Sequence, residues 1–187
     1  MPRVSPEVLA ARRRQILDGA RAAFARHGYE GATVRVLEEE IGVSRGAIFH
    51  HFPDKDAIFF ALAAEDAAAM ADVATRSGLV QAMRDMVAAP DAGWLGTALE
   101  ISRRVRTDPE FRATWAQRSR AITEATRARL QRQRDAGVLR DDVDIDVLVT
   151  YLELVREGLV AHLAAGLPAE HLTGVLDLVE SSVRRRP

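Results

Sequence analysis

The sequence predicts an all-α fold of about nine helices, with a head of short helices followed by a body of longer ones. Nearly every long segment repeats its apolar residues three and four positions apart, which is the period of an amphipathic helix. Glycine, proline and capping residues interrupt these segments where helices would end. No stretch alternates apolar and polar residues as a half-buried strand would. The three observations together favour helices throughout the chain.

The head is expected to form helices at about residues 6–27, 34–41 and 45–52. Thr33 and Ser44 can cap the second and third of these, because a hydroxyl at that position accepts from the first free backbone amides. Gly42 lies between them and allows the chain to turn sharply. The second and third helices therefore have the lengths of a helix-turn-helix.

The body is expected to contain longer helices, and the sequence sets limits for those at about residues 55–76, 94–106, 108–135, 145–165 and 168–184. Asp108-Pro109 is a strong start signal, since an acidic cap is followed by proline at the first helical position. Gly166-Leu167-Pro168 separates the last two helices. We expect one domain at residues 1–55 and a second at residues 56–187.

Composition restricts the classes of protein that fit. The 187 residues include no cysteine, which excludes disulfides and thiolate metal sites. A net charge of −1 argues against a protein that coats nucleic acid non-specifically. The charged N-terminus does not resemble a signal peptide, and no apolar run is long enough to cross a membrane. We expect a cytoplasmic protein that does not bind membranes.

The segment VSRGAIFHHF, residues 43–52, has the residue types of a DNA-reading helix. Ser44 would cap the helix and leave its first turn facing outward, which is the part that enters the major groove. Gly46 and Ala47 are small and permit a close approach to DNA, and Arg45 can offer two donors to a guanine edge.

His50 and His51 could instead bind a metal or pack at the helix end. As metal ligands they are poorly spaced, because adjacent residues on a helix point about 100° apart whereas helical zinc pairs lie one turn apart. No His-Asp dipeptide of the kind used by helical phosphohydrolases occurs. Donation to a phosphate or a base is the better account of the pair, although packing of either histidine stays open.

The head resembles the N-terminal signature of TetR-family transcriptional repressors. The matching residues are Gly28-Tyr29, Thr33-Val34, Gly42-Val43-Ser44, Gly46, Ile48-Phe49, His51-Phe52 and Lys55. The signature covers about residues 10–60, and beyond it only the helical layout is matched. The resemblance implies a homodimer that binds a palindromic operator in double-stranded DNA, with a C-terminal body that senses a ligand and dimerises.

The resemblance also implies roles for single residues. Thr33, His51 and Lys55 match positions that contact phosphates, and Arg45, Gly46, Ala47 and His50 fall on the recognition face. Together with Ser44 and Arg35, these residues form the expected DNA-binding set. The chain departs from the family pattern at three positions: Phe49 replaces a frequent tyrosine, and Glu38 and Ile41 stand where alanines are usual.

A closer resemblance is to the actinobacterial branch of this family that represses aconitase genes. It rests on EGATVRVLEEEIGVSRGAIFHHFPDKD, LEISRRVRTDPEFRATW and GVLDLVESSVRRR, and Glu38 belongs to that branch. The branch implies control of an aconitase gene and a tricarboxylate effector such as citrate, with Mg²⁺ as a companion of the effector rather than an obligatory cofactor.

Two charged residues lie on apolar helix faces in the body. Arg129 continues a stripe that includes Phe111, Trp115 and Ile122, and Glu180 lies within the apolar face of the last helix. A buried guanidinium needs an anion, and a buried carboxylate needs a cation or a donor. The two residues could pair with each other or reach solvent. Alternatively, Arg129 binds an effector carboxylate and Glu180 helps to hold a metal ion.

The last two helices are rich in aliphatic residues, which could form a self-complementary dimer face or pack within the chain. These residues are Leu148, Leu152, Val155, Leu159, Leu176, Val179 and Val183. The leading interpretation is a ligand-responsive DNA-binding repressor. The alternatives are a related regulator of another operon with a different effector, or an all-α enzyme or protein-interaction bundle. An enzyme should show a nucleophile–base pair or metal-ligand spacing, and neither is present.

Overall fold

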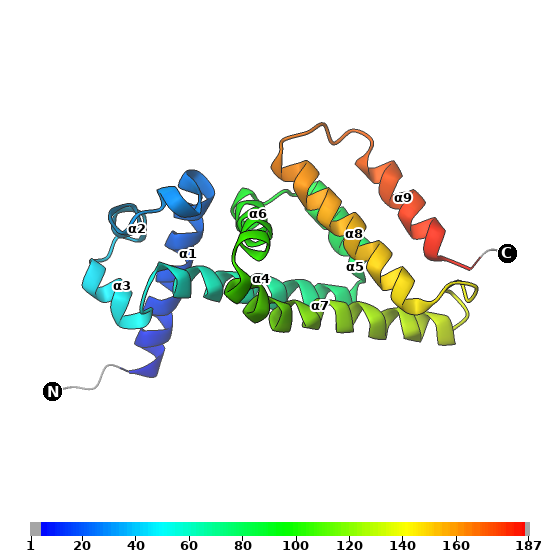
Figure 1. The fold of residues 1–187 in the computed structure, drawn as a ribbon, viewed down its shortest axis with the longest axis horizontal. Helices are drawn as coiled ribbons and strands as arrows, with labels where there is room; N and C mark the ends of the chain where they lie inside the picture. Colours follow the sequence, from blue (N-terminus) through cyan, green and yellow to red (C-terminus); the bar gives the residue numbers. More distant parts are fainter. Residues whose placement is uncertain (1–4, 186–187) are drawn as a thin grey trace. The chain divides into compact units, whose positions relative to one another are not determined.

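The computed structural model describes residues 5–185, and every structural statement below concerns that range. Residues 1–4, in the charged N-terminus, and residues 186–187, at the end of the final arginine run, lie outside it. Figure 1 shows the helices in chain order. They are α1 (Pro6–Gly31), α2 (Val34–Ile41), α3 (Arg45–His51), α4 (Lys55–Arg76), α5 (Leu79–Ala88), α6 (Ala92–Thr107), α7 (Pro109–Asp135), α8 (Ile145–Ala164) and α9 (Leu172–Val183).

The described residues confirm the all-α prediction, and their only strand-like pairing is an isolated bridge between Leu139 and Arg184. The predicted break at Gly28 is present within α1, where φ of 66° and ψ of 173° interrupt the helical backbone. The last helix begins later than predicted, at Leu172 rather than near Pro168. The residues after Pro168 form a turn in which the Leu172 amide donates to the Ala169 carbonyl.

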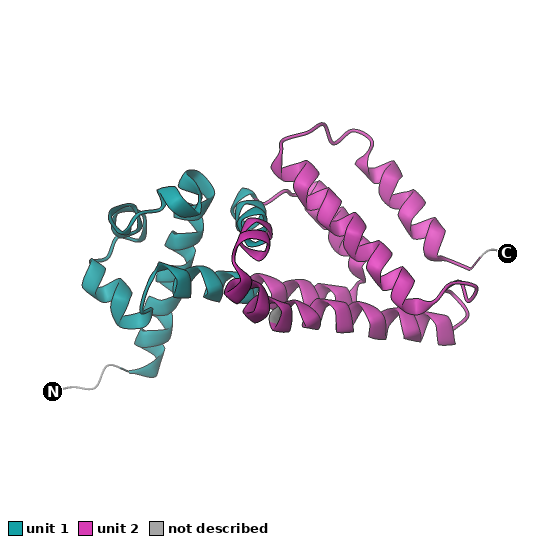
Figure 2. Ribbon diagram, viewed as in Figure 1, with its two compact units in different colours: residues 1–65, 92–101 teal, residues 66–91, 102–187 magenta. Residues whose placement is uncertain are grey.

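The described chain forms two compact units, drawn in teal and magenta in Figure 2. Within the described range, the first comprises residues 5–65 and 92–101, and the second comprises residues 66–91 and 102–185. The division falls within α4 and within α6, so it differs from the expected boundary between residues 55 and 56. The expected boundary divides residues by function, into those that bind DNA and those that bind an effector. The compact units do not test that division, which stays a prediction.

The first unit is held together by a close crossing of α1 and α2. Gly19 of α1 lies so near Ile41 of α2 that a Cβ at residue 19 would come within 2.8 Å of both Cα and Cγ1 of Ile41. Ile41 is buried there, which explains how a large residue is accommodated where the family favours alanine. Beside this crossing, the rings of Phe24, Tyr29 and Phe59 pack with centroids 5.2–5.7 Å apart.

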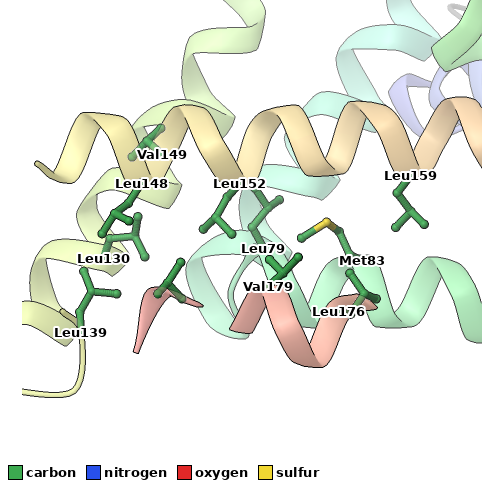
Figure 3. Packing of buried hydrophobic residues seen from close by; sticks show 11 residues of the cluster. Leu79, Met83, Leu130, Leu139, Leu148, Val149, Leu152, Leu159, Leu176 and Val179 are labelled. Atoms are coloured by element: carbon green, nitrogen blue, oxygen red, sulfur yellow. The ribbon is translucent and has the colours of Figure 1, made fainter. Parts of the chain in front are cut away.

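The second unit has an aliphatic core in which α5 packs against α8 and α9, and α7 packs against α8. Figure 3 shows Leu79, Leu152 and Val179 converging from α5, α8 and α9, with Met83 and Leu176 beside them. The same core contains six of the seven residues considered for a dimer face, namely Leu148, Leu152, Leu159, Leu176, Val179 and Val183. The interpretation of these six as an intermolecular surface is therefore wrong, because periodicity identifies an apolar face but not the partner that covers it.

Candidate DNA-binding surface and effector cavity

The helix-turn-helix is built by local capping. Thr33 and Ser44 are the N-caps of α2 and α3, and their hydroxyls accept from the Val36 and Ala47 amides at 3.4 Å. Gly42 ends α2 with φ of 73°, a left-handed conformation that favours glycine. The turn between the two helices thus has the conformation that the sequence predicts.

Glu38 supplies a second cap that the sequence did not predict. Its Oε1 accepts from the Arg45 amide at 2.5 Å, so the carboxylate of α2 satisfies a free N–H at the start of α3. A carboxylate at a helix N-terminus also interacts favourably with the helix dipole. Glu38 therefore joins α2 to α3, which gives a structural reason for glutamate where the wider family has alanine.

The recognition face presents polar and small residues to the surface. Ser44, Arg45, Gly46 and His50 are exposed, and Ala47 is half-buried. No atom outside the helix backbone lies near a Cβ built at Gly46, so the surface there is open. The Arg45 guanidinium lies 5.7 Å from the centre of the Phe49 ring, a contact that leaves its N–H donors available.

The residues expected to contact phosphates differ in their surroundings. Thr33 is exposed at the start of α2, and the exposed Arg35 pairs with Glu39 at 3.0 Å. Lys55 is half-buried, and its Nζ donates to the Tyr29 backbone carbonyl at 2.8 Å. The same Nζ lies 4.1 Å from the centre of the Tyr29 ring. A lysine ammonium has three donors, so this bond leaves others for a phosphate.

His51 lies in a positively charged environment. Burial lowers the pKa of His51, and the positive charges of His50, Arg12 and Arg13 lower it further. The guanidinium of Arg13 lies 4.4 Å from the centre of the Phe52 ring, which places it beside the end of α3. Arg12 and Arg13 were not among the residues expected at this candidate surface, although the run ARRR at residues 11–14 was a visible signal.

The second unit contains a cavity of about 210 Å³. Arg129 of α7 and Glu180 of α9 both line it, so the structure brings together the two residues proposed as effector ligands. Arg84 of α5 and Arg184, directly after α9, also line the cavity. Three guanidiniums and one carboxylate give the charged lining a positive surplus, which suits an anion.

Arg129 does not pair with Glu180. Its Nη1 donates to the backbone carbonyls of Thr75 and Arg76, at 3.2 and 2.9 Å, and thereby satisfies the C-terminal end of α4. Gly78 makes room for this arrangement, since a Cβ there would lie 2.7 Å from Nε of Arg129. Within the described residues Arg129 is half-buried and forms no ion pair with a carboxylate.

Glu180 is held by two other arginines. Its Oε2 accepts from Arg84 at 2.7 Å, and its Oε1 accepts from Arg184. Arg84 also binds Asp177 at 2.8 Å. The hydrogen bond from Arg84, followed by that from Arg184, lowers the pKa of Glu180 and keeps it ionised. A mutual Arg129–Glu180 ion pair, the alternative left open by the sequence, is therefore absent from the described residues.

The surroundings of Glu180 do not form a magnesium site by themselves. Among the described residues no group of three or more His, Asp and Glu side chains could hold a metal ion. Both carboxylate oxygens of Glu180 accept from guanidiniums, which compete with a cation. Mg²⁺ normally retains several waters and takes one or two carboxylates, so most of its ligands would have to come from effector and solvent.

The cavity residues that sequence reasoning missed include Gly78, Arg84, Thr126 and Arg184. Thr126 lies three positions before Arg129 on α7, which is one helical turn, so the stripe that identified Arg129 could have identified it. Arg84 and Arg184 carried no such signal. Their place beside Glu180 depends on how α5 packs on α9, which no local pattern specifies.

No helix within residues 5–185 is both long enough and apolar enough to cross a membrane. The profile of the family described as "Bacterial regulatory proteins, tetR family" matches residues 16–62, which include α2 and α3.

Relatives extend this match over the whole chain. A helix-turn-helix transcriptional repressor of Mycobacterium tuberculosis is 61% identical over 99% of this chain and 100% of its own. The HTH-type transcriptional repressor AcnR of Corynebacterium diphtheriae is 57% identical over 98% and 97% of the two chains. These relatives confirm the resemblance found in the sequence and are repressors, which decides against an enzyme.

A solved structure has the same fold. A transcriptional regulator of Saccharomonospora viridis, in complex with choline, superposes with a TM-score of 0.79 at 23% identity, over 95% of this chain and 100% of that one. On the evidence of these relatives and of the helix-turn-helix, the chain belongs to the TetR family of bacterial transcriptional regulators.

Proposed function

We propose that this TetR-family repressor binds a palindromic operator as a homodimer and responds to a di- or tricarboxylate held in the cavity of the second unit. The observation that carries the effector proposal is Arg129, a half-buried guanidinium in a positively lined cavity whose partners are carbonyls rather than a carboxylate. A bidentate bond to an effector carboxylate joins two opposite charges, so it is stronger than these bonds to uncharged carbonyls.

The proposed DNA contacts are of two kinds. Arg45 and His50 would read base edges in the major groove, with Ser44, Gly46 and Ala47 allowing close approach. Thr33, Arg35, His51 and Lys55 would hold phosphates and set the register of the head on the duplex. The outward caps of α2 and α3 and the exposure of the recognition face support this assignment.

The proposed response works through the end of α4. When an effector carboxylate binds the Arg129 guanidinium, the hydrogen bonds from Arg129 to the Thr75 and Arg76 carbonyls are broken. The C-terminal end of α4 is then released. That helix is continuous from Lys55, beside the recognition helix, to Arg76. In a dimer the two recognition helices must match major grooves about 34–36 Å apart, so a shift of α4 by a few ångströms would alter operator affinity.

The proposed dimer surface is the exposed apolar part of α8 and α9. Leu154 and Leu178 are 63% and 70% exposed, and Val147 and Val175 lie exposed on the same two helices. Apolar side chains gathered on two adjacent helices are typical of a surface that a second molecule covers. The surface differs from the buried face considered from the sequence.

Citrate is the first candidate effector, and an aconitase gene is the proposed target. Both follow from the resemblance of residues 30–56, 99–115 and 174–186 to the aconitase-repressor branch. Capture of genomic fragments by the purified protein tests the target. Recovery of a fragment upstream of an aconitase gene is the expected result, and recovery only of unrelated operons would favour the alternative of another regulon.

Thermal melts with citrate, isocitrate and malate, each with and without Mg²⁺, test the effector. A ligand bound only by the folded state adds RT ln(1 + [L]/Kd) to stability, so the wild type should melt at a higher temperature with citrate. Mg²⁺ should increase the shift if it shares the ligand with Glu180, because the ion offsets repulsion between carboxylates. An Mg²⁺-independent shift would remove the metal from the proposal.

Variants of α7 make this test specific. Arg129→Ala should abolish the citrate shift, and Arg129→Lys should reduce it because an ammonium lacks the planar fork of donors. Arg120→Ala is the control, since Arg120 is exposed on the same helix and does not line the cavity. If no acid raises the wild-type melting temperature, or if Arg129→Ala and Arg129→Lys both fail to fold, the effector proposal is wrong and Arg129 has a structural role.

A further inference from the structure

Thr126 is a buried side chain in the wall of the effector cavity with an unpaired hydroxyl. It is 2% exposed and lies near the middle of α7. Its Oγ1 has no hydrogen-bond partner among the described residues. A buried hydroxyl without a partner costs free energy, so its retention at a cavity wall needs a reason.

Several other helical threonines in this chain pair their hydroxyls within the protein. Four of them donate to the carbonyl four residues earlier at 2.8–3.0 Å, namely Thr75, Thr97, Thr107 and Thr150. This bond is available to any threonine within a helix. Thr126 does not form it, so its Oγ1 stays unpaired and covered within the wall of the cavity.

The position of Thr126 places it beside the proposed carboxylate ligand. Thr126, Arg129 and Leu130 are spaced three and four positions apart on α7 and all line the cavity. A ligand bound by Arg129 therefore lies against the side of the cavity that contains Thr126. A hydroxyl can donate to a carboxylate oxygen, and it adds no charge to a lining that already has a positive surplus.

We propose that Thr126 is a specificity-determining residue of the effector site, whose hydroxyl donates to a carboxylate oxygen of the bound acid. This inference rests on the proposed function, since it assumes a carboxylate in the cavity. The bond forms only with ligand present, and it satisfies a group that is unpaired in the free protein. Thr126 therefore contributes to effector affinity and not to the stability of the free protein.

Titration calorimetry with citrate on the wild type, Thr126→Val and Thr126→Ser tests this proposal. Valine keeps the shape of threonine and removes the hydroxyl. The Kd of Thr126→Val should rise about ten- to a hundredfold, the effect of one hydrogen bond to a charged group. Thr126→Ser retains the hydroxyl and should keep the Kd within about threefold. Without ligand, Thr126→Val should melt at the wild-type temperature or about 2–4 °C above it, because an unsatisfied polar group is lost.

Thr97→Val is the matched control. Thr97 is also buried within a helix, but its hydroxyl donates to the Gly93 carbonyl and it lies outside the cavity. Its citrate Kd should equal that of the wild type. If the wild type binds citrate and Thr126→Val binds it equally well, this inference alone is overturned.

Two further results are decisive. A melting temperature of ligand-free Thr126→Val that falls by about 5 °C or more would reveal a structural partner for the hydroxyl and overturn the inference. If the wild type binds none of citrate, isocitrate and malate, the proposed function and this inference fail together.

Discussion

Arg45 is the side chain of α3 best placed to distinguish one base from another. It is exposed at the first position of the helix, behind a turn capped by Ser44 and Glu38. Arg45→Ala should weaken operator binding by about 1–3 kcal/mol and relax base preference at one position in each half-site. Competition binding on operator variants measures both effects.

Two comparisons make the Arg45 test specific. Arg120→Ala removes an exposed arginine of the second unit that does not line the cavity, and it should leave operator affinity unchanged. Equal losses for Arg45→Ala on operator and random DNA would show that Arg45 contacts only phosphate.

His51 should make operator binding depend on pH. Burial and the charges of His50, Arg12 and Arg13 hold the pKa of His51 below its ordinary value, so the side chain is mostly neutral in the free protein near neutral pH. A phosphate beside it favours the protonated form and raises that pKa in the complex. Binding then takes up a proton, and affinity should rise as pH falls from about 8 towards about 6.

Fluorescence anisotropy titrations at several pH values measure this dependence, which His51→Gln should reduce. His27→Gln is the control, because His27 lies 3.7 Å from Glu40 and is outside the expected DNA-binding set. An unchanged pH slope in His51→Gln would exclude His51 from the phosphate contacts.

At the residue level, the sequence identified side chains whose chemistry conflicts with their place on a helix. Arg129 and Glu180 stood out as charges on apolar faces, and the structure places both at one cavity. The partners of these two side chains could not be identified from the sequence in the same way. Arg84 and Arg184 come from opposite ends of the unit's sequence and meet Glu180 through the packing of α5 on α9.

Helix limits were predictable wherever a local cap or breaker acts. The predicted limits of α2 and α4 agree with the structure, since Thr33 and Gly42 bound the first and Ser77-Gly78 follow the second. The start of α9 was not predictable from Pro168, because the chain forms a turn there before the helix begins at Leu172. A proline permits a helix start without requiring one.

The crossing of α1 and α2 should depend on Gly19. Gly19→Ala places a Cβ 2.8 Å from the Cα of Ile41, a backbone atom that cannot rotate away. Overpacking of this kind costs about 1–3 kcal/mol, so the free energy of unfolding should fall by that amount. Chemical denaturation monitored by circular dichroism measures the change.

Gly46→Ala separates this effect from the general effect of replacing a helical glycine. A Cβ at Gly46 meets open space, and alanine is favoured over glycine within a helix by about 1 kcal/mol. Gly46→Ala should therefore keep or raise stability while weakening DNA binding. Equal stability of Gly19→Ala and wild type would show that α1 and α2 separate at little cost.

At the scale of the whole molecule, the homodimer is the first claim to test. Leu178→Glu places a charge on the most exposed of the large apolar residues on α9 and should convert a dimer to a monomer at micromolar concentration. Affinity for a palindromic operator should fall when the dimer dissociates, because the single head of a monomer can occupy only one half-site. Sedimentation velocity measures the assembly state.

Leu99→Glu is the control for the dimer test, because Leu99 is also an exposed leucine but belongs to α6 and is not part of the proposed surface. It should remain a dimer. A monomeric wild type, or a dimeric Leu178→Glu variant, would place the intermolecular contact elsewhere or remove it from the account.

The central claim is that a carboxylate bound near Arg129 alters the binding of DNA by the helix-turn-helix. The measurement that tests it most directly is operator affinity as a function of citrate concentration, for the wild type and for Arg129→Ala. Wild-type affinity should change by about five- to 150-fold, the usual range of coupling between two sites, and the affinity of Arg129→Ala should not change. Wild-type affinity that is independent of citrate, isocitrate and malate, or an Arg129→Ala response equal to that of the wild type, would contradict it.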